Sequence, residues 1–315
     1  MRSNPFIFLV PGQGSDPRGA LLGLYRTAES VRREVDGLLD EVEQSAEGSA
    51  TAVRDILLTE DWKAPLGPGV PQIANYTISV VLARVLATVG VRPDAVVGQS
   101  FGEIAALVCA GVFDVSDGVR AVDALNSAFK DFEGKGAMVL VCASERVTRS
   151  MLADLGRSDL VVACVNTPQQ TIVSGPMDAV DALLSRSAVG PRLVRLPVPY
   201  ASHHPELQAV AERFRAGLRR IPHRPLGVPV FSPVRRRAYT DSDDLYDALA
   251  DCVTKPVYLP EILDMVAADR APFFIELGVG DSLCRCVQAT RPESRTLAPL
   301  NGSLSWLTEI CPDFG

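Results

Sequence analysis

Short apolar runs alternate along the chain with segments whose apolar residues recur at helical spacing. Residues 71–87 are typical of a helix, because their apolar positions lie three or four residues apart. Further helices are predicted at 102–110 and near 205–218, 243–252 and 259–267, and strands at 6–10, 95–97, 228–231 and 272–277. This alternation predicts an α/β fold with a largely parallel sheet, in which residues 6–10 form a central strand.

The pattern changes between residues 136 and 198. Strands are predicted at 137–142, 160–165, 171–174 and 193–198, and helices at 146–155 and 178–185. Their order, βαββαβ, is the signature of a ferredoxin-like unit. We therefore expect a small subdomain at residues 133–198, inserted into a larger one formed by residues 1–132 and 199–315.

The charge and hydropathy of the chain exclude several classes of protein. The 315 residues include 38 acidic and 31 basic side chains, a net charge of −7, whereas nucleic-acid-binding proteins normally present a basic face. The best apolar stretch, residues 78–91, is shorter than the ~18 residues of a membrane helix and contains Arg84. Residues 6–10 run into Pro-Gly-Gln-Gly without a small-residue cleavage site, so we expect a strand rather than a signal peptide, and a cytoplasmic protein.

The cysteines and histidines form no metal-binding pattern. Seven cysteines are scattered at positions 109, 142, 164, 252, 284, 286 and 311 without a Cys-x-x-Cys pair, and the chain has three histidines. A zinc site needs clustered ligands at characteristic spacing. We therefore expect no metal, and we interpret most of the cysteines as buried free thiols.

Gly98-Gln99-Ser100-Phe101-Gly102 matches the G-x-S-x-G pattern of a nucleophile elbow, between a predicted strand and a predicted helix. The glycines avoid clashes with the neighbouring strand and helix, and the sharp turn exposes the hydroxyl where backbone N–H groups can bind an oxyanion. An ordinary strand-to-helix turn built from small residues is the alternative. The context on both sides favours a nucleophile.

A serine nucleophile needs a base, and three histidines compete for that role. His223 lies between prolines and an arginine in a predicted surface loop, so we expect it to be solvated. His203 and His204 follow the last strand of the small subdomain, where the chain returns to the larger one. Capping or surface roles remain open for these two histidines.

Five segments in this order resemble the malonyl-CoA:acyl-carrier-protein transacylase family and the acyltransferase domains of polyketide synthases. They are Pro11-Gly12-Gln13-Gly14-Ser15, Gly98-Gln99-Ser100-Phe101-Gly102-Glu103, Asn166-Thr167-Pro168 with Val173-Ser174-Gly175, Tyr200-Ala201-Ser202-His203, and Glu276-Leu277-Gly278-Val279-Gly280. The resemblance covers about residues 5–300. It implies an α/β-hydrolase-like subdomain with a parallel sheet, carrying an inserted ferredoxin-like subdomain.

The resemblance also assigns roles to single residues. It implies that Ser100 accepts the acyl group, that His203 is its base, and that Gln13 and the N–H of Phe101 form the oxyanion hole. In the family a backbone carbonyl four residues before a Pro-Val pair orients the histidine, and Pro256-Val257 places that carbonyl at Cys252. Such a dyad moves an acyl group from one thioester to another through an ester, with no bound cofactor; the acyl carriers are coenzyme A or the phosphopantetheine of a carrier protein.

Departures from the family pattern concern the substrate pocket, for which we expect Gln99, Leu125, Asn126, Asn166, Tyr200 and Ser202. Gln99 replaces the usual histidine, and Asp16 stands where glutamine is common. Malonyl-type members carry an arginine that pairs with the substrate carboxylate; here that position falls on Leu125 or, with one shift, on Asn126, and neither can pair with a carboxylate. Tyr200-Ala201-Ser202-His203 is often associated with methylmalonyl specificity. We nevertheless expect a substrate without a carboxylate, because a buried carboxylate without the arginine would be unpaired.

The sequence therefore predicts a stand-alone acyltransferase that moves a non-carboxylated acyl group, such as an aminoacyl or dipeptidyl group, onto or between acyl carrier proteins. The alternatives are a hydrolase that clears acyl groups from carrier proteins, a malonyl or methylmalonyl transacylase, and an inactive carrier-binding module. Carrier proteins are acidic. Arg146, Arg149, Arg219-Arg220 and Arg235-Arg236-Arg237 are candidate contacts for one, although each group could equally belong to a solvated face.

Overall fold

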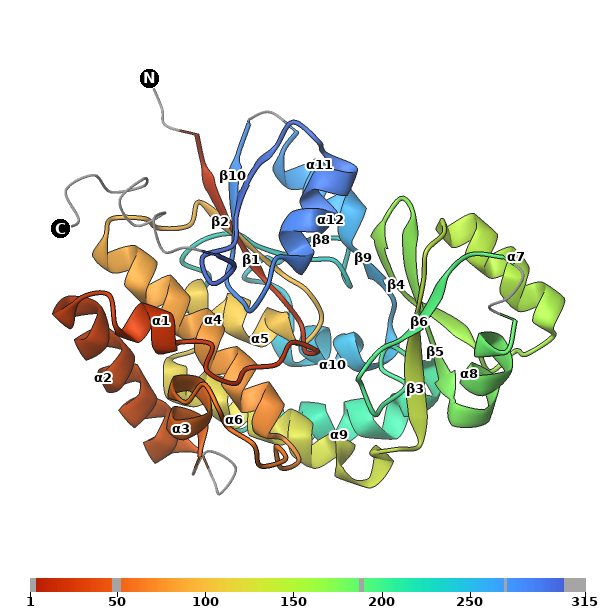
Figure 1. Ribbon diagram of the computed structural model, residues 1–315, viewed down its shortest axis with the longest axis horizontal. Helices are drawn as coiled ribbons and strands as arrows, with labels where there is room; N and C mark the ends of the chain where they lie inside the picture. The colour runs from red at the N-terminus through yellow and green to blue at the C-terminus, as the bar shows by residue number, and fades with distance from the viewer. Residues whose placement is uncertain (1–3, 47–51, 187–189, 269–270, 303–315) are drawn as a thin grey trace.

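The structure has two sheets, and the buried strand β1 lies in the middle of the larger one (Figure 1). The computed structural model describes residues 4–46, 52–186, 190–268 and 271–302. Six strands there are ordered β11-β10-β1-β2-β7-β8, with bounds β1 Phe6–Val10, β2 Ala95–Gly98, β7 Val230–Ser232, β8 Arg237–Ala238, β10 Phe273–Glu276 and β11 Arg295–Leu297. All neighbouring pairs are parallel except β7 with β8. The α/β class and the central position of residues 6–10 are confirmed.

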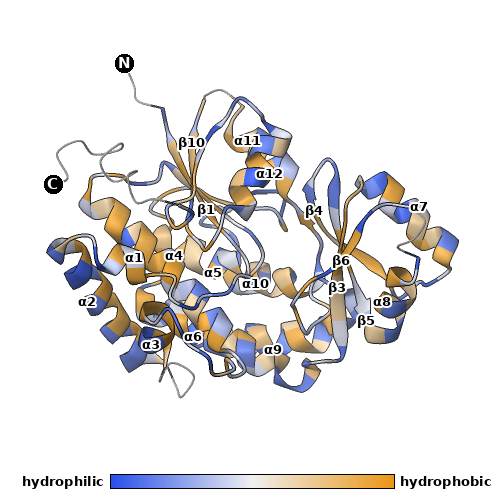
Figure 2. Ribbon diagram, in the orientation of Figure 1, coloured by the Kyte–Doolittle hydropathy of each residue, from blue (hydrophilic) through white to orange (hydrophobic). Residues whose placement is uncertain are grey.

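Side chains of β1 alternate between two cores, because successive residues of a strand point to opposite faces of the sheet. Phe8 and Val10 join the larger core, which is packed by α1 Leu22–Tyr25, α2 Glu29–Ser45, α3 Val53–Leu58, α4 Val70–Thr88, α5 Gly102–Cys109, α6 Val115–Phe129, α9 Gln208–Leu218 and α10 Leu245–Thr254. Ile7 and Leu9 pack on the other face, against α11 Leu259–Val266 and α12 Ser282–Thr290. Figure 2 shows the apolar strands between these helices.

Most residues of helix α4 are buried. Among the described residues it alone is long and apolar enough to cross a membrane by length and composition. However, 72% of the relevant window is buried inside the protein, which is the behaviour of a core helix. Helix α4 has Pro71 in its first turn, where a missing N–H costs no hydrogen bond.

The smaller sheet has five strands in the order β6-β3-β5-β4-β9. The bounds are β3 Gly136–Val141, α7 Glu145–Leu155, β4 Val161–Thr167, β5 Gln170–Pro176, α8 Met177–Leu184, β6 Leu193–Arg195 and β9 Val257–Tyr258. The first four strands and both helices follow the predicted βαββαβ order. Strand β9 was not predicted: the chain returns from the larger subdomain and adds two residues parallel to β4.

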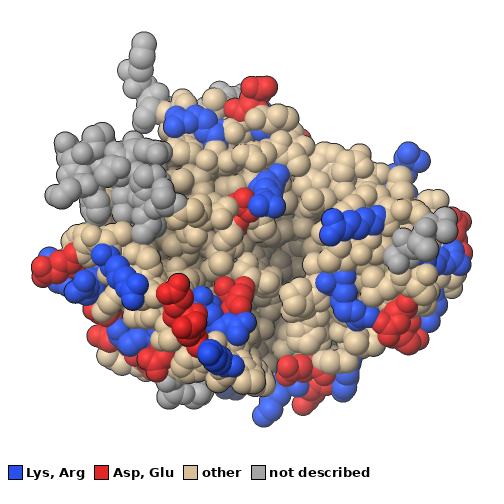
Figure 3. Space-filling view, in the orientation of Figure 1, with Lys and Arg blue, Asp and Glu red and all other residues tan. Residues whose placement is uncertain are grey.

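The two sheets leave a hollow between them. In Figure 3 it opens on the viewed face between the larger part of the molecule and the smaller one, and its visible floor carries no charged side chain. The carboxyl ends of β1 and β2 point toward this hollow. Parallel α/β sheets bind ligands at the carboxyl ends of their strands, so the topology alone places a site here.

Candidate active site

The turn that carries Ser100 joins β2 to α5 and depends on two glycines. Ser100 has a φ of 56°, a conformation that non-glycine residues rarely adopt. A Cβ on Gly98 would lie 2.6 Å from Cα of Glu103, and one on Gly102 would lie 2.3 Å from the carbonyl oxygen of Val10. The predicted reason for both glycines, a clash with the neighbouring helix and strand, is therefore confirmed.

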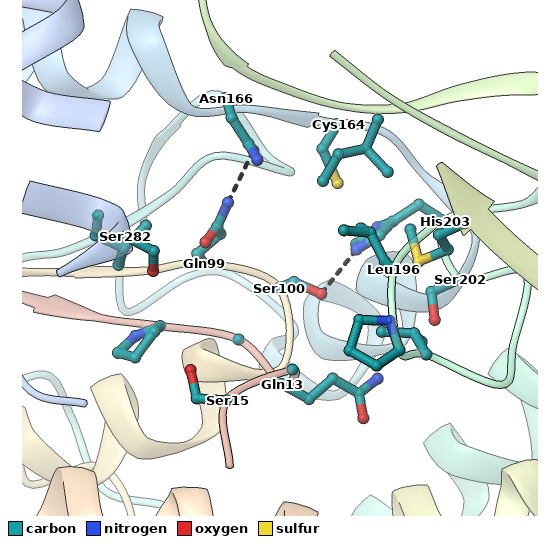
Figure 4. A pocket seen from close by; sticks show the side chains of 18 of the residues that line it. Gln13, Ser15, Gln99, Ser100, Cys164, Asn166, Leu196, Ser202, His203 and Ser282 are labelled. Carbon is teal, nitrogen blue, oxygen red and sulfur yellow. Dashed lines mark hydrogen bonds between the residues drawn. The ribbon is translucent and has the colours of Figure 1, made fainter. Parts of the chain in front are cut away.

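His203 lies against Ser100, from a segment 103 positions away. Its Nε2 is 2.7 Å from the Oγ of Ser100, and its Nδ1 is 2.8 Å from the carbonyl oxygen of Lys255 (Figure 4). Because a carbonyl can only accept, Nδ1 carries the ring proton and Nε2 is free to accept the hydroxyl proton. The geometry is that of a nucleophile and a general base.

The predicted orienting carbonyl of Cys252 is wrong; Lys255 supplies it. Cys252 lies in the last turn of α10, and a helical carbonyl points along the helix axis. Lys255 is the C-cap of that helix, with φ −101° and ψ 149°, so the chain is extended there and its carbonyl is directed at His203. Cys252 instead lines a small cavity beside Ser100.

Burial keeps the His203 ring neutral. The side chain is 2% exposed. Desolvation lowers the pKa of His203 to about 4, against a smaller opposing effect of the hydrogen bond to Lys255. The ring is therefore unprotonated at neutral pH, as a general base must be.

Gln13 and Phe101, the residues predicted to form an oxyanion hole, line the small cavity beside Ser100. Phe101 is the N-cap of α5, and in the described part of the chain no hydrogen bond occupies its N–H. The Oε1 of Gln13 accepts a 2.8 Å hydrogen bond from Nε2 of Gln72, which leaves the amide nitrogen of Gln13 free to donate. Sequence reasoning missed Gln72, because its helix α4 lies far from the motif along the chain.

A cavity of about 270 Å³ contains the Ser100–His203 pair. It is lined by Pro11, Gly12, Gln13, Gly14, Ser15, Gln99, Ser100, Met138, Cys164, Asn166, Ile172, Leu196, Pro197, Val198, Ser202, His203, Ser282, Leu283 and Cys286. Gln99 donates to Oδ1 of Asn166 at 2.9 Å, so the residue before the nucleophile joins the two subdomains. Among the described residues, no lysine, arginine, aspartate or glutamate contributes to this lining.

A second, smaller cavity of about 30 Å³ lies on the other side of Ser100, beside α6. Its lining is Gln13, Ser100, Phe101, Ile104, Leu125, Phe129, Ser202, Phe214, Leu249, Cys252 and Val253. Leu125, one of the predicted pocket residues, lines this cavity. The lining is again uncharged.

Two other predicted pocket residues lie outside these two cavities. Asn126 follows Leu125 by one helical residue, about 100° around the axis, and its amide donates to the carbonyl of Gly69 at 3.2 Å. Tyr200 packs its ring on Phe129 at 4.8 Å and lines a neighbouring cavity beyond Gln13. In that cavity Arg18 is paired with Asp16, the residue that replaces the family glutamine.

Glu103 is a buried carboxyl directly after the elbow, and the sequence analysis assigned it no role. It accepts hydrogen bonds from Ser232 Oγ at 2.8 Å and from the hydroxyl of Tyr239. Desolvation raises the pKa of Glu103 to about 7, although both hydrogen bonds act in the opposite direction. Its bonds join α5, the helix that follows the nucleophile, to β7 and to the residue directly after β8.

Most arginines considered for carrier binding are already paired. Arg235 binds Asp251, Arg236 binds Glu261, and Arg237 binds Asp243. Arg149 binds Glu145, and Arg219 binds Asp244. These pairs favour a solvated, locally neutralised face over a free basic patch.

Comparisons with known proteins agree with this geometry. The protein-family model described as the acyl transferase domain matches residues 7–299 of this chain. The chain is 32% identical to erythronolide synthase EryA3 of Saccharopolyspora erythraea over 94% of its own length and 9% of that protein. It is 29% identical to the malonyl CoA-acyl carrier protein transacylase of Escherichia coli, over 88% of this chain and 90% of that one.

The fold is also similar to that of solved structures. A loading acyltransferase from the avermectin modular polyketide synthase superposes with a TM-score of 0.85 at 26% identity, covering 98% of this chain and all of that one. The chain spans less than a tenth of the length of the curated polyketide synthases it matches. With the elbow, the Ser100–His203 pair and these matches in agreement, the chain belongs to the acyl transferase domain family.

Proposed function

We propose that this protein transfers a non-carboxylated acyl group, such as an aminoacyl or dipeptidyl group, onto or between acyl carrier proteins in polyketide-type biosynthesis. Ser100 holds the acyl group as an ester between the two half-reactions. The observation that carries the proposal is the uncharged lining on both sides of Ser100, with Leu125 at the predicted carboxylate position.

The energetics of a buried carboxylate support this choice of substrate. A malonyl group would bring a negative charge into a cavity that holds no cation among its lining residues. Leaving a buried charge unpaired costs several kcal/mol. Arg18 is the cation lining the neighbouring cavity, and Asp16 already neutralises it.

The geometry supports a two-step transfer. The hydroxyl proton of Ser100 moves to Nε2 of His203 while Oγ attacks the thioester carbonyl, and Gln13 and the N–H of Phe101 stabilise the oxyanion. The C–S bond then breaks, and the departing thiol takes the proton from His203. A second thiol repeats these events in reverse, releasing Ser100 and forming the new thioester.

The carrier-protein partner rests on the named relatives. The Escherichia coli relative is a transacylase for an acyl carrier protein, and this chain covers nine-tenths of it. Coenzyme A or phosphopantetheine carries the acyl group as substrate.

Mass spectrometry of Ser100 tests the proposal. The enzyme is incubated with a panel of thioesters: malonyl, methylmalonyl, a simple acyl and an aminoacyl. We expect adducts on Ser100 from the uncharged and amino-bearing members; adducts from malonyl or methylmalonyl alone would contradict the proposal. The isolated acyl-enzyme is then incubated with and without holo carrier protein. Loss of the acyl group only with the carrier indicates transfer, whereas equal loss in water indicates a hydrolase.

A further inference from the structure

His204, the neighbour of the proposed base, is a buried ring with both nitrogens engaged. It is 4% exposed. Its Nε2 lies 3.1 Å from the carbonyl oxygen of Asp159, and its Nδ1 accepts from the backbone N–H of Glu206 at 3.3 Å. Because a carbonyl only accepts and a backbone N–H only donates, Nε2 is the donor of these two contacts and Nδ1 is the acceptor. His204 therefore joins two segments of the chain.

The carbonyl that His204 binds belongs to a fixed part of the small subdomain. Asp159 stands two residues before β4. Its carboxylate pairs with Arg157 at 2.6 Å, and Arg157 also binds Asp178 of α8 at 2.8 Å. Gly175 on β5 packs so closely that a Cβ there would lie 2.7 Å from the Asp159 carbonyl oxygen. The acceptor is held by a strand, a helix and a turn together.

The segment that precedes His203 rests on the same sheet. The N–H of Gly134 donates to the carbonyl of Pro199 at 2.8 Å. A Cβ on Gly136, the first residue of β3, would lie 2.6 Å from the Cβ of Ala201. The segment that carries the base thus contacts the small subdomain, whereas Ser100 follows a strand of the larger sheet.

We propose that His204 is a positioning residue: its hydrogen bond to Asp159 fixes the base-bearing segment to the small subdomain and so holds His203 within reach of Ser100. The backbone of His203 has a φ of 58°, and such conformations persist only where the surroundings over-determine them. Besides the hydrogen bonds of the His203 ring itself, those of the next residue, His204, constrain the backbone at this point. The inference rests on the dyad of the proposed function but on no particular acyl group.

Two substitutions separate the contacts of His204. In His204→Asn the short side chain can still accept from the N–H of Glu206, since asparagine is a good N-cap, but it cannot reach Asp159. In His204→Gln the longer amide can still donate to the Asp159 carbonyl. His223, an exposed histidine, provides the control variant His223→Asn.

A fluorophosphonate probe measures the result without knowledge of the substrate. Ser100 Oγ displaces fluoride from phosphorus while His203 takes the hydroxyl proton, and mass spectrometry follows the adduct. We expect His204→Asn to react about 10- to 100-fold more slowly, the loss typical of a displaced catalytic group. The acid midpoint of its pH profile should shift upward as His203 becomes more solvated. His204→Gln should recover most of the rate, and His223→Asn should match the wild type.

Thermal midpoints measured in parallel keep this test specific. The proposal is overturned if His204→Asn reacts at the wild-type rate with an unchanged pH midpoint, if His204→Gln is as slow as His204→Asn, or if the rate only follows the folded fraction. Labelling of Ser100→Ala at the wild-type rate would overturn the proposed function itself. Failure of the His204 variants alone would leave that function standing.

Discussion

The Oγ of Ser100 lies 2.7 Å from Nε2 of His203, and both residues have a positive φ, 56° and 58°. Each conformation is costly for a non-glycine residue, so the surrounding packing must hold it. The elbow glycines do this for Ser100, and the contacts of the neighbouring segment do it for His203. The two reacting groups therefore meet before any substrate arrives.

Removing either member of this pair should stop acyl transfer. Ser100→Ala leaves no atom to form the ester, so we expect no acyl-enzyme by mass spectrometry. His203→Ala keeps the hydroxyl but removes the base, and we expect a rate loss of about 10⁴-fold or more. His204→Ala should retain measurable turnover. Loss of all turnover in His204→Ala with survival of His203→Ala would reverse the assignment of the base.

The reaction rate at Ser100 should fall in acid only at an unusually low pH. Burial lowers the pKa of His203 to about 4, so the base stays neutral well below the ordinary histidine pKa of about 6.5. We expect the fluorophosphonate rate to fall with a midpoint near pH 4 while the protein remains folded. Between about pH 6.5 and 4, His203 is protonated in the unfolded chain but not in the folded protein. The free energy of unfolding should therefore decrease as the pH falls through this range. A rate midpoint near 6.5 would mean that the ring is solvated.

Gln13→Ala should lower the acylation rate by roughly 10²- to 10³-fold, the usual loss for one oxyanion donor. Gln72→Ala should have a smaller effect in the same direction, because Gln72 only orients the Gln13 amide. Single-turnover kinetics, with circular dichroism to confirm folding, measure both. An unchanged rate in Gln13→Ala would reduce Gln13 to a turn residue.

Glu103 should make the fold less stable as pH rises. Its pKa is raised to about 7 in the folded protein, so the native state holds a proton that the unfolded chain has already released. The stability due to the protonated form is present below about pH 4.5 and is lost as pH rises toward 7. Glu103→Gln cannot titrate. Urea unfolding measures the free energy of unfolding of Glu103→Gln and of the wild type. The value for the variant minus that for the wild type should increase between pH 4.5 and 7 and then level off. A difference that stays constant with pH would contradict the raised pKa of Glu103.

Much of the fold could be predicted because its signals are local. The central strand and the elbow depend on apolar runs and on glycines that the turn requires, and both are visible in the sequence. Helix α2 was not predicted, although Val31, Val35, Leu38, Leu39 and Val42 follow a helical period. Strand β9 was not predicted either, because two residues carry no periodicity.

The details that were missed depend on backbone direction. Spacing from Pro256 pointed to Cys252, but only the extended C-cap at Lys255 turns a carbonyl toward the base. From the sequence, Leu125 and Asn126 were both candidates for the position of the family arginine. In the helix their side chains are about 100° apart, so Leu125 lines the small cavity and Asn126 binds the carbonyl of Gly69. Neither distinction is encoded in residue type.

Leu125→Arg should move the substrate preference toward carboxylated acyl groups. The guanidinium would reach the small cavity beside Ser100 and offer two parallel hydrogen bonds to a carboxylate. We expect the malonyl-to-neutral acylation ratio to rise about tenfold or more, because a desolvated charge pair is worth a few kcal/mol. Leu125→Met, which keeps an apolar side chain of similar volume, should leave the ratio unchanged.

The most direct test of the account is a competition on the wild-type enzyme. Malonyl and an uncharged acyl thioester of similar length are supplied at equal concentration, and the two Ser100 adducts are counted by mass spectrometry in the first turnover. Because none of the described residues that line the cavities holding Ser100 is a cation, we expect the uncharged adduct to dominate. Equal or faster loading of malonyl would show that another cation supplies the carboxylate site, and would contradict this expectation.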